Sequence, residues 1–194
     1  AYEYVRAAEI VLQSGITDAY AHYQWAHYSL LLAGIHALTG LDMFTAAHLL
    51  NAVLFALISL GFVNLVAAAT PSRRVVWLAA LIILIFPTLN ESRYLIVRDT
   101  GFLAFSQLAM LQLLRVWLSL RLRHAVLFVT CCLLATLFRP EAIAFWLLSP
   151  LALLFNNSHS PAACRWALAV TVGLSIMLAT LVVVAVARQQ MLNT

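Results

Sequence analysis

Residues 44–69 read FTAAHLLNAVLFALISLGFVNLVAAA, a run whose only ionisable side chain is a histidine. At about 1.5 Å of rise per residue, a helix over this run is long enough to cross the roughly 30 Å hydrocarbon core of a bilayer. Five further apolar runs follow, at about 75–89, 100–120, 125–138, 142–156 and 166–187. The sequence therefore predicts an all-α fold, a polytopic transmembrane bundle with about six spanning helices.

Three of these runs are short for a membrane span. The runs at 75–89, 125–138 and 142–156 have only about 15 residues each. Such helices cross a bilayer only if polar residues extend their ends or if the bilayer thins around them.

The composition excludes most soluble classes. Hydrophobic residues make up 64% of the 194 positions and charged residues 9%, whereas a soluble domain carries about a quarter charged residues. The net charge of +4 comes from arginine alone, and the arginines stand at the ends of apolar runs. This placement indicates membrane topology and contact with lipid headgroups, and it argues against a nucleic-acid partner. The cysteines show neither metal spacing nor a disulfide framework and are expected to pack as apolar side chains: Cys131, Cys132 and Cys164.

The first forty-two residues differ from the rest. Residues 1–14 mix polar and apolar side chains in the pattern of an interfacial helix that ends near Gly15, with Thr17 and Asp18 in the following loop. Residues 22–40 open with aromatic side chains typical of the headgroup level, which predicts a second interfacial or re-entrant helix. We therefore expect two domains: residues 1–42 as outer-face juxtamembrane helices and loop, and residues 43–194 as the transmembrane helical domain.

The arginines predict how the bundle is oriented. If each run crosses once, the connections that carry them lie on one side, which the positive-inside rule makes cytoplasmic: Arg73, Arg74, Arg121, Arg123 and Arg165. The loop over 90–99 and the turn over 139–141 then lie on the outer side. The remaining acids lie there too, provided that residues 1–42 do not cross the membrane.

The outer loop and turn hold the residues best suited to binding or catalysis. Asp99 is expected in the first turn of a helix, where the dipole favours an acid. Pro140 should end one helix after Arg139 and begin the next at Glu141, which holds both charges at one depth. The simplest alternative is that these charges pair with one another and face water.

A site of arginines and carboxylates suits an anionic, lipid-attached substrate. Guanidinium groups bind phosphate oxygens in a bidentate manner, and Arg139, Arg98 and Arg93 are the candidates. A carboxylate can act as a general base or bind a divalent ion. Polar residues within the runs are expected instead to form interhelical hydrogen bonds: His48, Asn51, Asn64, Gln107 and Gln112.

The order of these features resembles the GT-C-type membrane glycosyltransferases, in the branch of the protein O-mannosyltransferases and the bacterial aminoarabinose transferases. The matching stretches are AYEYVRAAE at 1–9, YQWAHY at 23–28, HALTG at 36–40 and AAHLLNA at 46–52. Ser92-Arg93, Arg98-Asp99 and Arg139-Pro140-Glu141 complete the series. The resemblance covers nearly the whole chain and depends on order and spacing more than on one invariant block.

The resemblance implies a transferase that moves a sugar from a polyprenyl-phosphate carrier to a lipid, glycan or protein acceptor at the outer face of a bacterial inner membrane. Asp99 matches the second acidic position of the family, and Arg139 matches the position that contacts the carrier phosphate, with Arg93, Arg98 and Glu141 as further binding candidates. The first catalytic acid is expected just before Ala1, which leaves Glu3 as the nearest acid. The chain is then a piece lacking its first span and its continuation after Thr194. A divalent metal ion remains open as a cofactor.

Two other functions fit parts of the pattern. A transporter or lipid flippase would use the short runs, one interrupted at Pro140, as broken helices around a binding site at the membrane centre. A non-catalytic membrane scaffold is favoured if Asp99 and Arg139 lie far apart. The depth of the Arg139–Glu141 turn and its distance from Asp99 distinguish these alternatives.

Overall fold

The computed structural model describes residues 2–23, 26–92, 95–155 and 161–192, and over these residues every regular element is helical. The all-α expectation is confirmed. The elements are α1 (Tyr2–Gln13), α2 (Ile16–His22), α3 (His27–Thr39), α4 (Met43–Ala69), α5 (Arg73–Ile85), α6 (Pro87–Ser92), α7 (Asp99–Ser119), α8 (Leu122–Phe138), α9 (Ala142–Leu148), the 3₁₀ helix η1 (Ser149–Phe155) and α10 (Pro161–Leu192).

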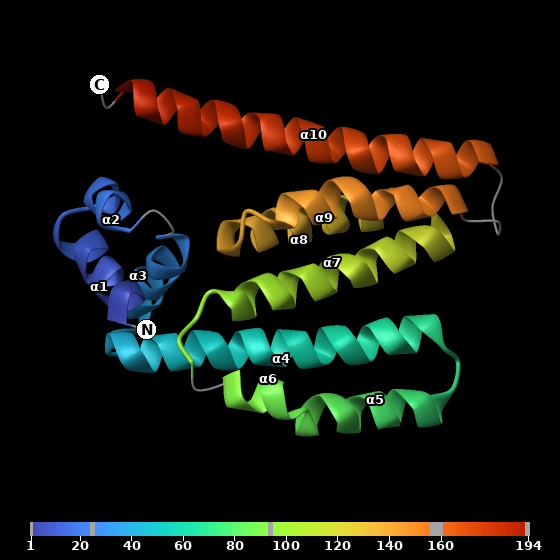
Figure 1. Cartoon of the computed structure of the whole chain (residues 1–194), viewed down its shortest axis with the longest axis horizontal. Coiled ribbons are helices and arrows are strands. Elements are labelled where there is room, and N and C mark those ends of the chain that lie inside the picture. The colour runs from blue at the N-terminus through green and yellow to red at the C-terminus, as the bar shows by residue number, and fades with distance from the viewer. Residues whose placement is uncertain (1, 24–25, 93–94, 156–160, 193–194) are drawn as a thin grey trace.

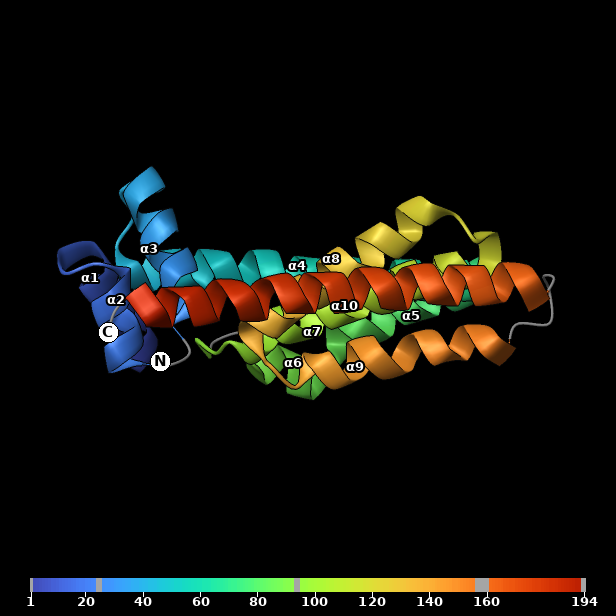
Figure 2. The same cartoon turned by 90° about the horizontal axis from the view of Figure 1, so that it is seen from above.

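The long helices run side by side, and the short N-terminal helices lie at one end of them (Figure 1, Figure 2). Helix α7 packs between α4 and α8, α5 packs on α4, and α10 packs on α8 and η1. Helices α1, α2 and α3 gather beside the start of α4 (Figure 1). The division into residues 1–42 and 43–194 stays a prediction. Buried residues of α1 and α3 share one core cluster with residues of α4 and α7: Val5, Tyr28, Leu32, Met43, Leu54 and Ala104.

Only two of the described helices are long and apolar enough to cross a membrane by length and composition, Met43–Ala69 and Asp99–Ser119. By the criterion of ~20 residues for each span, the described helices therefore supply two candidate spans and not the expected number of about six. The shorter apolar helices cover Leu122–Phe138, Ala142–Phe155 and Ala162–Met177. Two helices end shortly before a proline, which cannot continue a helix: Pro87 follows the end of α5, and Pro140 follows the end of α8.

Local chemistry fixes the start of α4. Gly40 closes α3 with a left-handed φ of 71°, which a residue without Cβ adopts at low cost. Asp42 then caps α4, since its Oδ1 accepts hydrogen bonds from the backbone N–H groups of Phe44 and Thr45, each at 3.1 Å. Hydrogen bonds from Thr45 hold the pKa of Asp42 below its usual value. The chain therefore leaves α3 and enters the long helix at a defined point.

Some expectations for single residues need correction. Thr17 and Asp18 belong to α2 and not to a loop. Asn64 bonds the carbonyl of Leu60 within its own helix, so its expected interhelical role is wrong. By contrast, Gln112 of α7 lies 2.9 Å from the Nδ1 of His124 in α8, as expected for an interhelical hydrogen bond.

Asn51 connects several parts of the fold through hydrogen bonds of its side chain. It is 1% exposed, and its Nδ2 donates to the carbonyl of Leu95 at 2.7 Å. Its Oδ1 accepts from the Tyr28 hydroxyl at 3.2 Å, and the Thr100 hydroxyl lies 3.3 Å away. Asn51 thus connects α4 to α3, to the segment before α7 and to the first turn of α7, which confirms the interhelical expectation.

The acidic residues gather at one end of the bundle, whereas arginines stand at both ends. The seven acidic residues of the sequence all lie on α1, on α2, or near the ends of helices that meet at the end where α4 begins: Glu3, Glu9, Asp18, Asp42, Glu91, Asp99 and Glu141. The opposite end, where α5, α8 and α10 begin, carries arginines: Arg73, Arg74, Arg115, Arg121, Arg123 and Arg165. The side-by-side helices therefore separate an end that holds acids together with arginines such as Arg98 and Arg139 from an end that holds arginines without acids.

Candidate functional site

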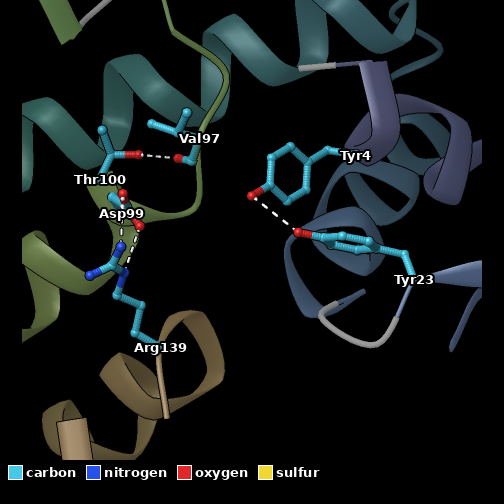
Figure 3. A network of polar contacts seen from close by, with 6 residues as sticks. All are labelled: Tyr4, Tyr23, Val97, Asp99, Thr100 and Arg139. Atoms are coloured by element: carbon cyan, nitrogen blue, oxygen red, sulfur yellow. Dashed lines mark hydrogen bonds and ion pairs between the residues drawn. The ribbon is translucent and has the colours of Figure 1, made fainter. Parts of the chain in front are cut away.

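An ion pair joins the two residues that the sequence singled out most strongly. The Nε of Arg139 donates to Oδ1 of Asp99 at 2.7 Å, and Nη2 donates to Oδ2 at 3.2 Å (Figure 3). Asp99 begins α7 and Arg139 follows the end of α8, so the pair closes the end of these two helices. Both side chains keep access to solvent, at 47% and 39% exposure respectively. The two residues, forty positions apart in the chain, form one bidentate unit.

A glycine makes this approach possible. A Cβ added at Gly101 would lie 2.2 Å from Cδ1 of Phe138. Phe138 is 4% exposed and stacks on Phe105, with ring centroids 5.7 Å apart. Because Phe138 immediately precedes Arg139, the missing side chain at Gly101 lets the end of α8 pack against the first turn of α7. The guanidinium also lies 5.9 Å from the ring centroid of Phe102, a geometry that favours a cation over the ring.

Two tyrosines from the N-terminal helices face the same region. The Tyr23 hydroxyl donates to the Tyr4 hydroxyl at 3.4 Å, and both rings lie across from the pair in Figure 3. Burial and the hydrogen bond to Tyr23 raise the pKa of Tyr4 to about 12, with Arg98 lowering it and Asp99 raising it. Tyr4 is therefore close enough to Arg98 and Asp99 for their charges to affect its pKa, and its hydroxyl stays protonated at neutral pH.

The other candidates are placed less centrally. Glu3 is exposed and pairs with Nε2 of His22 at 3.3 Å, so it lies on the α1–α2 contact and not in the Asp99–Arg139 pair. Glu141 stands in the exposed turn after Pro140 and precedes α9. Arg98 directly precedes Asp99 as the N-cap residue of α7. Arg93 lies outside the described residues.

An apolar hollow is lined in part by Phe138, the residue that precedes Arg139 in the chain. It has a volume of about 380 Å³ and is lined by residues of α3, α4, α7 and α8, among them His27, Leu54, Phe105 and Phe138. Burial lowers the pKa of His27, so its ring is neutral at pH 7. Phe138 lines the hollow and the next residue carries the guanidinium. The hollow and the charged pair are thus linked through two consecutive residues, although neither Asp99 nor Arg139 lines the hollow.

The side chains around Asp99 include few metal ligands. In the part of the chain that the structure describes, no three His, Cys, Asp or Glu side chains come together as ligands. Asp99 supplies one carboxylate, and both of its oxygens are bonded to Arg139. The chemistry available here is that of a carboxylate, a guanidinium and tyrosine hydroxyls.

Several residues of this site were assigned no role from the sequence. Gly101, Phe102 and Phe138 lie within apolar runs and carry no signal of their own, because their importance comes from which helices meet. Tyr4 and Tyr23 stand in the stretches that carry the family resemblance, and their aromatic character indicated the headgroup level without indicating a contact with α7.

Comparisons of the chain with protein-family models, with curated proteins and with solved structures find no match.

Proposed function

We propose that the chain belongs to a multi-pass membrane glycosyltransferase that moves a sugar from a polyprenyl-phosphate carrier to an acceptor. The proposal rests on the bidentate Asp99–Arg139 pair, which is solvent-accessible and is linked through Phe138 to an apolar hollow. A phosphate-bearing lipid has the matching chemistry, an anion joined to an apolar chain. The family resemblance of the sequence supplies the reaction type.

The pair suggests how binding and chemistry are coupled. The donor phosphate competes with Asp99 for the guanidinium, since both are anions that bind arginine in a bidentate manner. When Arg139 turns to the phosphate, Asp99 is released and can accept the proton of an acceptor hydroxyl or amine. The acceptor oxygen or nitrogen then attacks the anomeric carbon. The bond from that carbon to the phosphate oxygen breaks, and the lipid phosphate leaves with the electron pair, stabilised by Arg139.

The charge distribution supports a site at the outer surface of a bacterial inner membrane. Basic residues favour the cytoplasmic side of a membrane, and the arginine-rich end lies opposite the Asp99–Arg139 pair. We propose that α5, α8, α9 with η1 and α10 accompany α4 and α7 across the bilayer, with polar residues or local thinning accommodating the short helices.

A transporter with a broken helix at Pro140 receives less support. The chain reverses at this proline, and α9 packs back along α8 instead of continuing it (Figure 1, Figure 2). The charged turn therefore lies at the end of the helices, whereas a transport site would need it near their middle.

The test is sugar transfer from a polyprenyl-phosphate donor by the full-length protein in membranes. Asp99→Asn removes the base while keeping the shape, and we expect kcat to fall by about 10²–10⁴-fold. Arg139→Ala removes the phosphate partner and should raise KM and lower kcat together, with partial recovery in Arg139→Lys. Asp18→Asn and Arg6→Ala are matched controls on α1 and α2 and should transfer normally. Undiminished transfer by both Asp99→Asn and Arg139→Ala contradicts the proposal.

A further inference from the structure

The end of the bundle opposite the Asp99–Arg139 pair contains a second hollow, at the turn from α7 to α8. Its volume is about 510 Å³, and it is lined by Arg115, Leu118, Ser119, Arg121, Arg123 and His124. We propose that this hollow binds the phosphate group of an anionic membrane lipid. The proposal is independent of the sugar-transfer proposal, because the two sites share no residue and lie at opposite ends of the helices.

The positive charge of the hollow favours the binding of an anion. Three of its lining residues are arginines, and the acidic residues of the chain lie at the other end of the bundle. The ion pairs found among the described residues, Glu3 with His22 and Asp99 with Arg139, lie outside the hollow. Like charges at close range repel one another, and a bound phosphate relieves this repulsion while accepting several guanidinium hydrogen bonds.

A histidine holds one of these arginines in place. The Nε of Arg123 donates to Nε2 of His124 at 3.3 Å, so Nε2 is unprotonated and the ring proton is on Nδ1. Nδ1 then donates to Oε1 of Gln112 in α7 at 2.9 Å. His124 is 8% exposed and neutral, and this bond uses only the Nε–H of Arg123. The two Nη groups of that guanidinium remain available as donors in a fixed position.

The turn itself brings the arginines together. Leu120 ends α7 with φ 50° and ψ 29°, a left-handed conformation that side chains other than glycine rarely adopt. This sharp reversal lets α8 begin two residues later, so that Arg121 and Arg123 line the same hollow as Arg115 and Ser119. The hollow is a consequence of this reversal.

The apolar flanks favour a lipid over a soluble anion. Leu118 and Leu122, on either side of the turn, are 54% and 51% exposed. Leucines beside arginines at the end of a hydrophobic helix match a phosphodiester headgroup with its acyl chains alongside the protein. Inorganic phosphate has no apolar part that could contact these leucines.

The experiment is native mass spectrometry of the purified chain in a neutral detergent, titrated with dioleoylphosphatidylglycerol or with dioleoylphosphatidylcholine. The Arg121→Gln/Arg123→Gln variant is compared with Arg73→Gln/Arg74→Gln, which removes the same charge at the same end of the bundle but outside the hollow. Because hydrogen bonds between charged groups contribute strongly, we expect the hollow variant to lose about ten-fold or more in affinity for the anionic lipid. The matched variant should bind as the unaltered chain does.

Equal losses in the two double variants would show a diffuse charge effect and overturn the proposal, as would equal binding of the two lipids by the unaltered chain. A second arm adds inorganic phosphate at millimolar concentration. Displacement of the lipid by this phosphate would identify a soluble anion as the ligand and overturn the assignment to a lipid. If the double variant does not fold, Arg121→Gln is compared with Arg73→Gln, which removes the same single charge, since the Arg121 side chain is exposed.

Discussion

At the scale of single residues, Gly101 decides whether the two charges of the candidate site can meet. The ring of Phe138 occupies the space that a Cβ at this position would need. Packed cores absorb such an overlap only by moving side chains or backbone. The residue next to Phe138 is Arg139, so we expect a shift of the end of α8 to move the guanidinium relative to Asp99.

Gly101→Ala should therefore destabilise the chain by about 1–3 kcal/mol, as over-packed cores do, and should also lower sugar transfer. Chemical denaturation in detergent measures the first effect. Gly34→Ala on α3 is the matched control, because a Cβ there meets nothing within 4 Å. Equal stability of the two variants would contradict the role given to Gly101.

Tyr4 makes stability depend on alkaline pH. Its pKa rises from 10.0 to about 12, chiefly because burial disfavours the phenolate. A raised pKa means that the folded state holds the proton more tightly than the unfolded state does. The resulting stabilisation is complete below pH 10 and is lost as the pH rises through 12. Tyr4→Phe should show a smaller fall in melting temperature between these values than the unaltered chain, measured by circular dichroism.

At the scale of helices, Asn51 shows how polar contacts set the relative position of elements that apolar packing alone leaves free to slide. Its side chain contacts α3, the segment before α7 and the first turn of α7. The first turn of α7 carries Asp99, so the position of the site depends on Asn51.

Asn51→Ala should cost about 1–2 kcal/mol, because the buried carbonyl of Leu95 and the hydroxyl of Tyr28 lose their partner. Asn64→Ala removes the same side chain from the same helix, where it bonds only the preceding turn. Thermal unfolding of the two variants in the same detergent provides the comparison. A smaller loss for Asn51→Ala than for Asn64→Ala would be inconsistent with its connecting role.

The sequence predicted helices well and their meeting points poorly. Apolar runs at 44–69 and 100–120 became α4 and α7 within a residue or so of each end, since nothing inside them competes with helix formation. Pro140 and the charges around it predicted the turn that carries Arg139. Fewer described helices reach the length of a span than the expected number of about six, because the apolar runs at 75–89, 125–138 and 142–156 are short in the sequence itself. The Phe138–Gly101 contact could not be predicted from periodicity, since it depends on which faces pack.

At the scale of the whole molecule, the two ends of the bundle differ in charge and in the chemistry that they support. One end holds the acids, the Asp99–Arg139 pair and the apolar hollow beside it. The other end holds the arginine-lined hollow. Both proposals require these ends to lie at opposite surfaces of one membrane, with helices α1–α3 on the same surface as the pair.

Cysteine labelling in intact cells tests this arrangement most directly. Glu141→Cys, Thr39→Cys and Ser72→Cys are introduced one at a time into a chain whose cysteines, Cys131, Cys132 and Cys164, are replaced by alanine. A membrane-impermeant maleimide should label positions 141 and 39 from outside the inner membrane, and position 72 only after that membrane is opened. Labelling of positions 141 and 72 from the same side would contradict the account.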